Sequence, residues 1–504
     1  MHHEDPMAFT SGAVRRRLWP VVGFEHYMLA DDTQRHPMVF WLKATFTGRV
    51  DRERLKRSLQ YTASQQPLLR SRLYTNFFKF RFLLRWREDA DTEVFLDVAP
   101  KGTPLNFPRP GQLGFDLSKE PGLRLFVRED NESSEWYLQL HHAVTDGTGG
   151  LRFLEKLFEA YANGAAVWQR TVADEALPPH AVRRFTRRGY FDLSFWQIVK
   201  RLPIDLRTTF TYYAVIPRPL ARRRQDSPTA LDYRQKKSPT SINYTFSPES
   251  TAALKRCARA FHGTLNDLLL RDLFLSLAKF NKSGSKRRTI RLCMPVNMRT
   301  PHDDHLPIAN YMGMYALDRT DAELRQPHEL MTSITTETKR IKSHRLALAI
   351  AFVPKLLTFV PGLLTLALKR PGYWKCAATV VLSNLGPSFR RHLLPNNSDG
   401  QVVIDHLVLK RLELLPPVKI DTNLAIGVVT YHDAMTLTFH YDPLALSAHD
   451  VRTILADYVS QLSDSMMLDI GQSDAAKLST AVDPATNQPP ASPLDKRHLP
   501  SLTN

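Results

Sequence analysis

Two adjacent histidines, His141 and His142, begin the segment HHAVTDG, which ends at Gly147. An imidazole has an unperturbed pKa of about 6.5, so it is the side chain best suited to take up and return a proton near neutral pH. His142 is therefore our candidate for a general base. Asp146 follows four residues after His142 and could bend back to fix the loop. Gly147 allows backbone conformations that residues with a Cβ resist.

Two other interpretations of the histidine pair stay open: a surface pair at the end of a strand, and a metal site. A metal site needs further ligands, and neither an H-E-x-x-H motif nor a carboxylate at helical ligand spacing accompanies the two histidines. We therefore expect no metal. We expect His141 to form a local hydrogen bond.

The residues around the motif predict a strand followed by a helix. The strand runs from Trp136 to His142, and because side chains alternate along a strand, His142 and His141 point to opposite faces. The expected helix carries an apolar stripe at helical spacing, made of Leu151, Leu154, Leu157, Phe158 and Tyr161. The motif thus lies where a strand passes into a helix, a position that presents a side chain to a cleft from a rigid scaffold.

Strands and helices alternate along the rest of the chain, which indicates the α/β class. Residues 38–46 read as a strand, and Asp51 is a plausible N-cap for the helix that follows. A similar alternation restarts with a strand at 242–246, a helix at 265–280 and a strand at 289–296. We expect a flexible N-terminus (1–20), an N-terminal lobe (21–165), an Arg-, Pro- and aromatic-rich crossover (166–240), a C-terminal lobe (241–468) and a disordered tail (469–504).

The chain has 504 residues and a formal net charge of +18. Such a charge attracts nucleic acid, anionic lipid or phosphorylated small molecules such as coenzyme A. Zinc-finger spacing, a recognition-helix pattern and RNA-binding aromatic motifs are lacking in the sequence, so we expect no nucleic-acid partner.

The cysteines are few and widely spaced, and they bear on the compartment. None of the three forms a C-x-x-C motif, so we expect a reducing compartment, the cytoplasm. Glu25 and His26 interrupt the apolar stretch near the N-terminus too early for a signal-peptide core.

The apolar segment 346–368 is long enough to cross a bilayer, but Pro354, Lys355, Pro361 and Gly362 would break its backbone ladder in lipid. We expect short apolar helices instead. These would either line a tunnel that binds an acyl chain or touch a membrane surface.

HHAVTDG resembles H-H-x-x-x-D-G, the signature of the coenzyme-A-dependent acyltransferase superfamily. That superfamily includes condensation domains, alcohol acetyltransferases, and wax-ester synthases with diacylglycerol acyltransferases. Further segments resemble the family in its order and together cover roughly residues 20–465: QQPLLRSRL (65–73), FDLSKEPGLRLFV (115–127), HGTLNDLLL (262–270), MPVNMR (294–299) and VLSNLGP (381–387). The chain departs from the family at Gln66, where a histidine is common.

The resemblance implies two α/β lobes of chloramphenicol-acetyltransferase type that form a V, with a cleft between them. His142 would deprotonate a hydroxyl or amine that attacks an acyl thioester directly, without a covalent intermediate. Asp146 would be structural and pair with Arg299 from the second lobe, in a bidentate contact that holds the histidine loop. An ordinary surface arginine is the alternative for Arg299.

The resemblance also suggests residues near the cleft: Asn266, Asp267, Asn297, Ser383 and Asn384. For Asn266 and Asp267, helix capping is an equal alternative. The donor would be acyl-CoA or the phosphopantetheine thioester of an acyl carrier protein, with no resident cofactor. The acceptor would be a small-molecule or lipid alcohol or amine. Two other functions stay open: a catalytically inactive condensation-like binding or scaffold protein, and a basic peripheral membrane protein.

Overall fold

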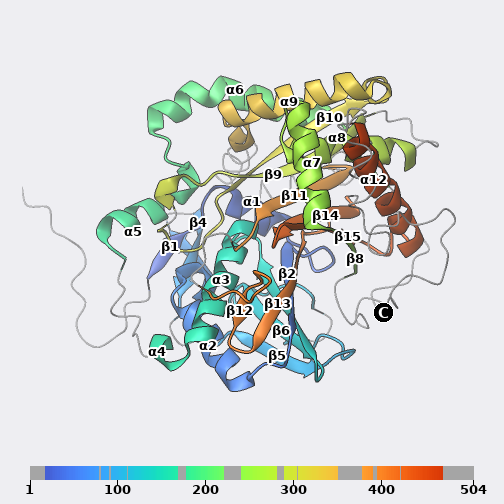
Figure 1. Ribbon diagram of the computed structural model, residues 1–504. Coiled ribbons are helices and arrows are strands. Elements are labelled where there is room, and N and C mark those ends of the chain that lie inside the picture. Colours follow the sequence, from blue (N-terminus) through green and yellow to red (C-terminus); the bar gives the residue numbers. More distant parts are fainter. Residues whose placement is uncertain are drawn as a thin grey trace, which may run out of the picture.

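The structure is a computed structural model. It describes residues 17–78, 81–89, 92–109, 112–168, 177–220, 240–280, 289–303, 305–349, 377–389, 394–419 and 422–468. Within these ranges the chain forms two six-stranded sheets and a small three-stranded sheet, with helices packed against them (Figure 1).

The first sheet forms the N-terminal lobe, with the strand order β12-β13-β2-β7-β6-β5. Only β5 and β6 pair in parallel; the other neighbours are antiparallel. Its strands are β2 (Val39–Thr47), β5 (Phe95–Pro100), β6 (Leu123–Glu129), β7 (Ser133–His141), β12 (Val403–Ile404) and β13 (Leu407–Leu415). Helices α2 (Arg52–Ser64) and α3 (Gly147–Asn163) share one hydrophobic core with this sheet. As expected, Asp51 caps α2, because its carboxylate accepts a hydrogen bond from the Arg54 N–H at 3.0 Å.

The second sheet has the order β10-β9-β11-β14-β15-β8. Strand β11 runs parallel to both β9 and β14, and the other neighbours are antiparallel. Its strands are β8 (Ser241–Phe246), β9 (Thr289–Asn297), β10 (Met312–Thr320), β11 (Val380–Pro387), β14 (Leu424–Tyr431) and β15 (Ala434–Tyr441). The helices of this lobe are α7 (Pro248–Ala260), α8 (Leu265–Phe280), α9 (Pro327–Ser343) and α12 (Ala448–Leu468).

The chain crosses between the lobes near its C-terminal end. Strands β12 and β13 lie within the range expected for the C-terminal lobe, 241–468, yet β13 pairs with β2 of the first sheet. The buried leucines of β13, such as Leu409, Leu412 and Leu414, join the first lobe's core. The boundary expected at residue 240 therefore does not divide the two sheets.

The range 166–240, expected as an irregular crossover, contains regular helices. Within its described part lie α5 (Pro179–Thr186), a short 3-10 turn (Arg188–Tyr190) and α6 (Phe195–Ala214), preceded by α4 (Ala165–Trp168). Helix α6 escaped the sequence pattern because Pro203 interrupts it and because its largest apolar side chains face outward.

A buried ion pair holds this range to the N-terminal lobe. Arg188 Nε donates to Glu25 Oε1 at 2.7 Å, and both side chains are almost completely buried. Glu25 belongs to α1 (Gly23–Asp31), and it also accepts a hydrogen bond from the indole of Trp86 on β4 (Arg81–Glu88). The small sheet β1-β4-β3 beside it consists of β1 (Leu18–Pro20), β3 (Ser71–Phe78) and β4 (Arg81–Glu88).

Three expectations fall wholly or largely on residues outside the described ranges: the flexible start before residue 17, the tail from 469, and most of the apolar segment 346–368. Of that segment, residues 346–349 are described, and Leu346–Leu348 form a 3-10 turn. In the described part of the chain, no helix combines the length and the apolar character that crossing a membrane requires.

Candidate active site

His142 lies directly after β7, where that strand passes into α3. The strand pairing between β2 and β7 continues past the strand end, because the His142 N–H donates to the Met38 carbonyl at 2.7 Å. The imidazole packs against the ring of Phe40, with 5.0 Å between the ring centroids, and the residue is only 8% exposed. The sheet thus places the imidazole at a fixed position at the edge of the lobe.

Burial makes His142 a neutral imidazole. Removal from water lowers the pKa of His142 to about 4, and the charge of Asp146 only partly opposes this shift. The backbone of His142 itself also opposes the shift, again only in part.

Asn310 fixes the backbone of the histidine loop. Its side-chain amide donates to the His142 carbonyl at 2.7 Å, and its own carbonyl accepts from the Met312 N–H. The same amide nitrogen lies 3.4 Å from His142 Nδ1, which is too long for a good hydrogen bond. Asn310 comes from the loop between β9 and β10, so a loop of the second lobe is hydrogen-bonded to the histidine loop of the first.

Asp146 forms the expected ion pair with Arg299, across the two lobes. Arg299 donates from one guanidinium nitrogen to Asp146 Oδ2 at 2.8 Å and from the other to the Ala309 carbonyl. The contact is therefore not the bidentate one that we expected. Both side chains are buried, so the alternative of a surface arginine is excluded.

The remaining bonds of Asp146 give it a structural role. Oδ1 accepts from the Gly149 N–H and caps α3, while Oδ2 also accepts from the Tyr311 N–H. Burial by itself would raise the pKa of Asp146, but the charge and hydrogen bond of Arg299, with these two N–H groups, outweigh it and lower the pKa. The carboxylate is consequently ionised, and both of its oxygens accept hydrogen bonds from these groups.

The feature of Gly147 that matters in the structure is its small size rather than its backbone freedom. Its φ is not in the left-handed region, which corrects the expectation from the sequence. A Cβ at this position would lie 2.7 Å from Cδ2 of Leu385 on β11. The glycine therefore lets the start of α3 meet a strand of the other lobe.

His141 is fully buried and bonds locally, as expected. Its Nδ1 accepts a hydrogen bond from the Ala143 N–H at 3.1 Å. That bond assigns the ring proton to Nε2, which lies 3.5 Å from Asp32 Oδ2. At this distance Nε2 and the Asp32 carboxylate do not form a hydrogen bond.

A cavity of about 60 Å³ opens beside His142, between the lobes. The first lobe contributes His142, Phe40 and the start of α3. Three of the predicted cleft residues, Asn297, Ser383 and Asn384, line it from the second lobe. Both lobes therefore contribute polar groups to the space that the imidazole borders.

The other two predicted cleft residues do not line this cavity. Asp267 is buried at the start of α8, where it accepts hydrogen bonds from Thr264 and Thr338, so the capping alternative was the correct one. Asn266 contacts Met294 Sδ at 3.6 Å, and the amide nitrogen of Asn384 lies 3.5 Å from its side-chain oxygen.

Sequence reasoning missed the loop that follows Arg299. Besides Asn310, this loop contains Ile308, whose N–H donates to the side chain of Gln66 at 2.9 Å. Gln66 is buried on the N-terminal lobe, so a further interlobe bond holds the same loop. A lone Asn such as Asn310 has no spacing pattern that would single it out in a sequence, and Gln66 stood out only as the position at which the chain departs from the family.

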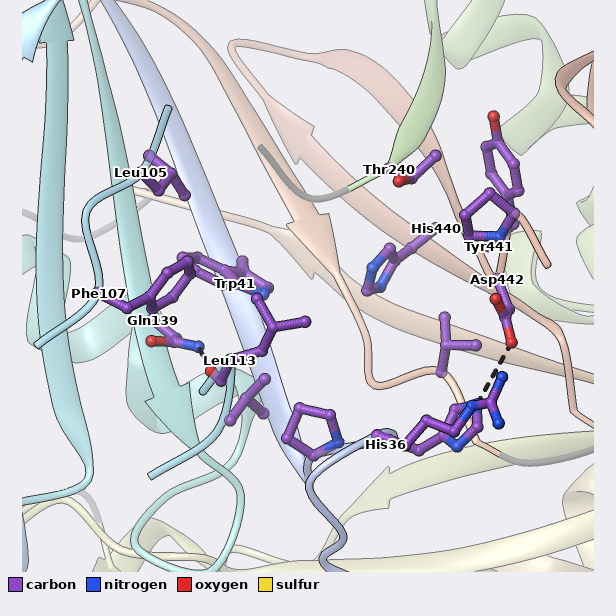
Figure 2. A pocket seen from close by; sticks show the side chains of 15 residues that line it. His36, Trp41, Leu105, Phe107, Leu113, Gln139, Thr240, His440, Tyr441 and Asp442 are labelled. Carbon is purple, nitrogen blue, oxygen red and sulfur yellow. Dashed lines mark hydrogen bonds and ion pairs between the residues drawn. The ribbon is translucent and has the colours of Figure 1, made fainter. Parts of the chain in front are cut away.

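A second cavity, of about 100 Å³, lies between the lobes near the start of β2. Figure 2 shows Trp41, Leu105 and Phe107 of the first lobe facing His440 and Asp442 of the second across it. His36 Nε2 and Asp442 Oδ2, 3.4 Å apart, join the two lobes at one end of the cavity.

One loop separates the two cavities. Pro416 and Pro417 line the cavity at His142, and the next residue, Val418, lines the second one. His440 holds this loop through a 2.6 Å hydrogen bond between Nδ1 and the Pro416 carbonyl.

Sequence comparisons find only distant relatives of this chain. No family model matches the chain. Two uncharacterized proteins from two strains of Mycobacterium tuberculosis are 23% identical over 300 residues, which is 59% of this chain and 66% of each relative. The match thus spans slightly less than two thirds of those relatives' length.

Solved structures resemble the chain over nearly its whole length. Trichothecene 15-O-acetyltransferase from Fusarium sporotrichioides has a TM-score of 0.61 at 12% identity, over 90% of this chain and 97% of that one. The first condensation domain of the calcium-dependent antibiotic synthetase has a TM-score of 0.60 at 15% identity, over 89% and 96%. Polyketide synthase associated protein 5 from Mycobacterium tuberculosis has 0.57 at 13%, over 89% and 100%. The chain therefore has the two-lobed fold of condensation domains, which confirms the expected fold class.

Proposed function

We propose that this chain, with its condensation-domain fold, transfers an acyl group from a thioester to a hydroxyl or amine, and that His142 is the general base. The observation that carries the proposal is the neutral, buried imidazole beside a cavity lined by both lobes. The names of the similar structures, which include an acetyltransferase and a condensation domain, agree with acyl transfer as the class of reaction.

The proposed reaction begins with proton transfer to His142. Nε2 takes the proton from the acceptor O–H or N–H while the acceptor's lone pair attacks the thioester carbonyl. The carbonyl π electrons move to oxygen and form a tetrahedral oxyanion. When the oxyanion collapses, the C–S bond breaks, and the imidazolium returns its proton to the thiolate, so that a free thiol leaves.

Side chains of the second lobe would stabilise the oxyanion. The Ser383 hydroxyl and the Asn384 amide line the cavity and are hydrogen-bond donors. Asp146 takes no part in proton transfer in this proposal, because Arg299 and two backbone N–H groups occupy its carboxylate.

The second cavity would bind the apolar part of one substrate. Its aromatic and aliphatic lining, with Trp41, Phe107 and Leu113, favours a lipophilic group. The donor thiol would be coenzyme A or the phosphopantetheine arm of a carrier protein, since the basic chain suits the phosphates of either.

The test is thioester consumption, followed as release of free thiol, with a panel of acyl-CoA and acyl-pantetheine donors and of alcohols and amines. His142→Ala should lower the turnover number by about 10²- to 10⁴-fold without changing the melting temperature by more than a few degrees. His180→Ala, on the exposed start of α5, is the matched control and should keep full activity.

Two outcomes would contradict the proposal. Full activity in His142→Ala would remove the base mechanism. Tight binding of donor and acceptor without product, across the whole panel, would favour an inactive binding or scaffold protein.

A further inference from the structure

Helix α6 carries an apolar stripe on its outer side. Nine large hydrophobic side chains of the described residues are exposed, and six of them belong to this one helix. The exposed fractions of Phe195, Trp196 and Phe210 are 68%, 70% and 76%. The six residues are Phe195, Trp196, Val199, Leu202, Leu206 and Phe210.

The stripe runs along most of α6. At about 100° per residue, the six side chains fall within an arc of about 120°, and at a rise of 1.5 Å the stripe is about 22 Å long. Scattered exposed apolar residues are ordinary, but a contiguous apolar face marks an interaction site. The stripe is thus a candidate interaction surface.

The opposite side of α6 is anchored to the second lobe. Arg201 donates to the carbonyls of His344 and Arg345, directly after α9, and to Asp205 at 3.0 Å. Thr209 donates to the Ala349 carbonyl. The helix is therefore fixed, and it lies at the periphery of the molecule (Figure 1). The exposed fractions show that its stripe faces outward.

The charges around the stripe are positive. Lys200 and Arg207 are exposed, and at helical spacing both lie just beyond one border of the stripe, seven residues apart. The only acid of α6, Asp205, is buried and paired with Arg201. At the adjoining end of α9, Lys339 and Lys342 are also exposed.

We propose that the α6 stripe binds the surface of a membrane that contains anionic lipid. An apolar face with aromatic residues, bordered by Lys and Arg and with no exposed acid on the helix itself, is the arrangement of a helix that lies in the plane of a lipid interface. Anionic headgroups complement the basic border. Membrane binding through the stripe is independent of the proposed acyl transfer, since none of the six side chains lines either cavity.

Binding of the whole chain to vesicles tests the proposal. Sedimentation is measured with vesicles of phosphatidylcholine alone and with roughly a quarter phosphatidylglycerol. We expect binding to the anionic vesicles that weakens as salt is added. Phe195→Glu with Phe210→Glu should reduce it by about tenfold or more. Lys200→Gln with Arg207→Gln should abolish the preference for anionic lipid.

Control variants show whether binding belongs to the stripe itself. Met467→Glu changes an exposed apolar residue on α12 (62% exposed) and should bind like the parent, as should His142→Ala. The stripe variants should keep their activity on a soluble thioester. Parental binding by the double Glu variant would overturn the proposal.

Two further results would also overturn it. If the parent binds neither kind of vesicle and elutes as a dimer, while the stripe variants elute as monomers, the partner is a second copy of the chain. If the stripe variants instead lower the melting temperature markedly and no vesicles bind, the stripe packs within the chain.

Discussion

At the scale of single residues, the neutral state of His142 sets the pH dependence of the proposed reaction. Because burial lowers the pKa of His142 to about 4, the imidazole stays unprotonated and competent as a base throughout the neutral range. We expect kcat/KM to be level between about pH 5 and 8 and to fall about tenfold per unit below pH 4. An acidic limb near the ordinary histidine pKa of about 6.5 would show that water reaches the imidazole.

The pair formed by Asp146 and Arg299 should behave as one unit. Arg299→Met leaves a buried carboxylate without its cation and should cost about 3 to 5 kcal/mol. The double variant Arg299→Met with Asp146→Asn should lose less stability than the sum of the losses in the two single variants. Melting temperatures of both single variants and of the double variant measure this. Lys56→Met, which breaks an exposed pair with Glu93, should change stability by about 1 kcal/mol or less. Strict additivity would exclude a coupled interlobe pair.

At the scale of elements, the junction of α3 with β11 depends on the small size of Gly147. Ala is the better helix former by about 1 kcal/mol, but the new Cβ would collide with Leu385, and overpacking costs about 1 to 3 kcal/mol. We therefore expect Gly147→Ala to lower both the melting temperature and the activity. Adding Leu385→Ala should restore part of both. If the double variant is no better than Gly147→Ala alone, the contact with Leu385 is not the cause.

Elements with strong apolar periodicity were predictable, and elements set by distant contacts were not. Helix α8 spans Leu265–Phe280, as its sequence indicated, because its apolar residues recur at the helical period and face the core. Helix α6 was hidden because its apolar residues face outward. For β13, alternation can indicate a strand but not the sheet that it joins, which depends on a partner far away in sequence.

The site divides in the same way. His142, Asp146 and Arg299 were accessible because the motif and its resemblance to a family identify them together. The positions of Asn310 and Gln66 depend on how one loop of the second lobe lies against the first. For Asp267 both alternatives stayed open, because a capping aspartate and a cleft aspartate look alike in a sequence.

At the scale of the whole molecule, the lobes should not be separable. Without β13, the edge of β2 would offer unpaired backbone groups, and exposed strand edges promote aggregation. We expect a fragment of residues 17–220 to aggregate when produced alone and to become soluble when produced together with residues 240–468. Light scattering and the distribution between soluble and pellet fractions measure this. A monomeric fragment with a cooperative melting transition would show that β2 does not need β13.

The shared sheet also bears on synthesis in the cell. Leu407, at the start of β13, follows the end of β2 at Thr47 by 360 residues. At translation rates of about 5 to 20 residues per second, roughly 20 to 70 seconds pass between the emergence of the two strands from the ribosome. The N-terminal lobe must therefore wait, incomplete, until most of its neighbour has been made, and during that interval the nascent chain is a natural client for chaperones.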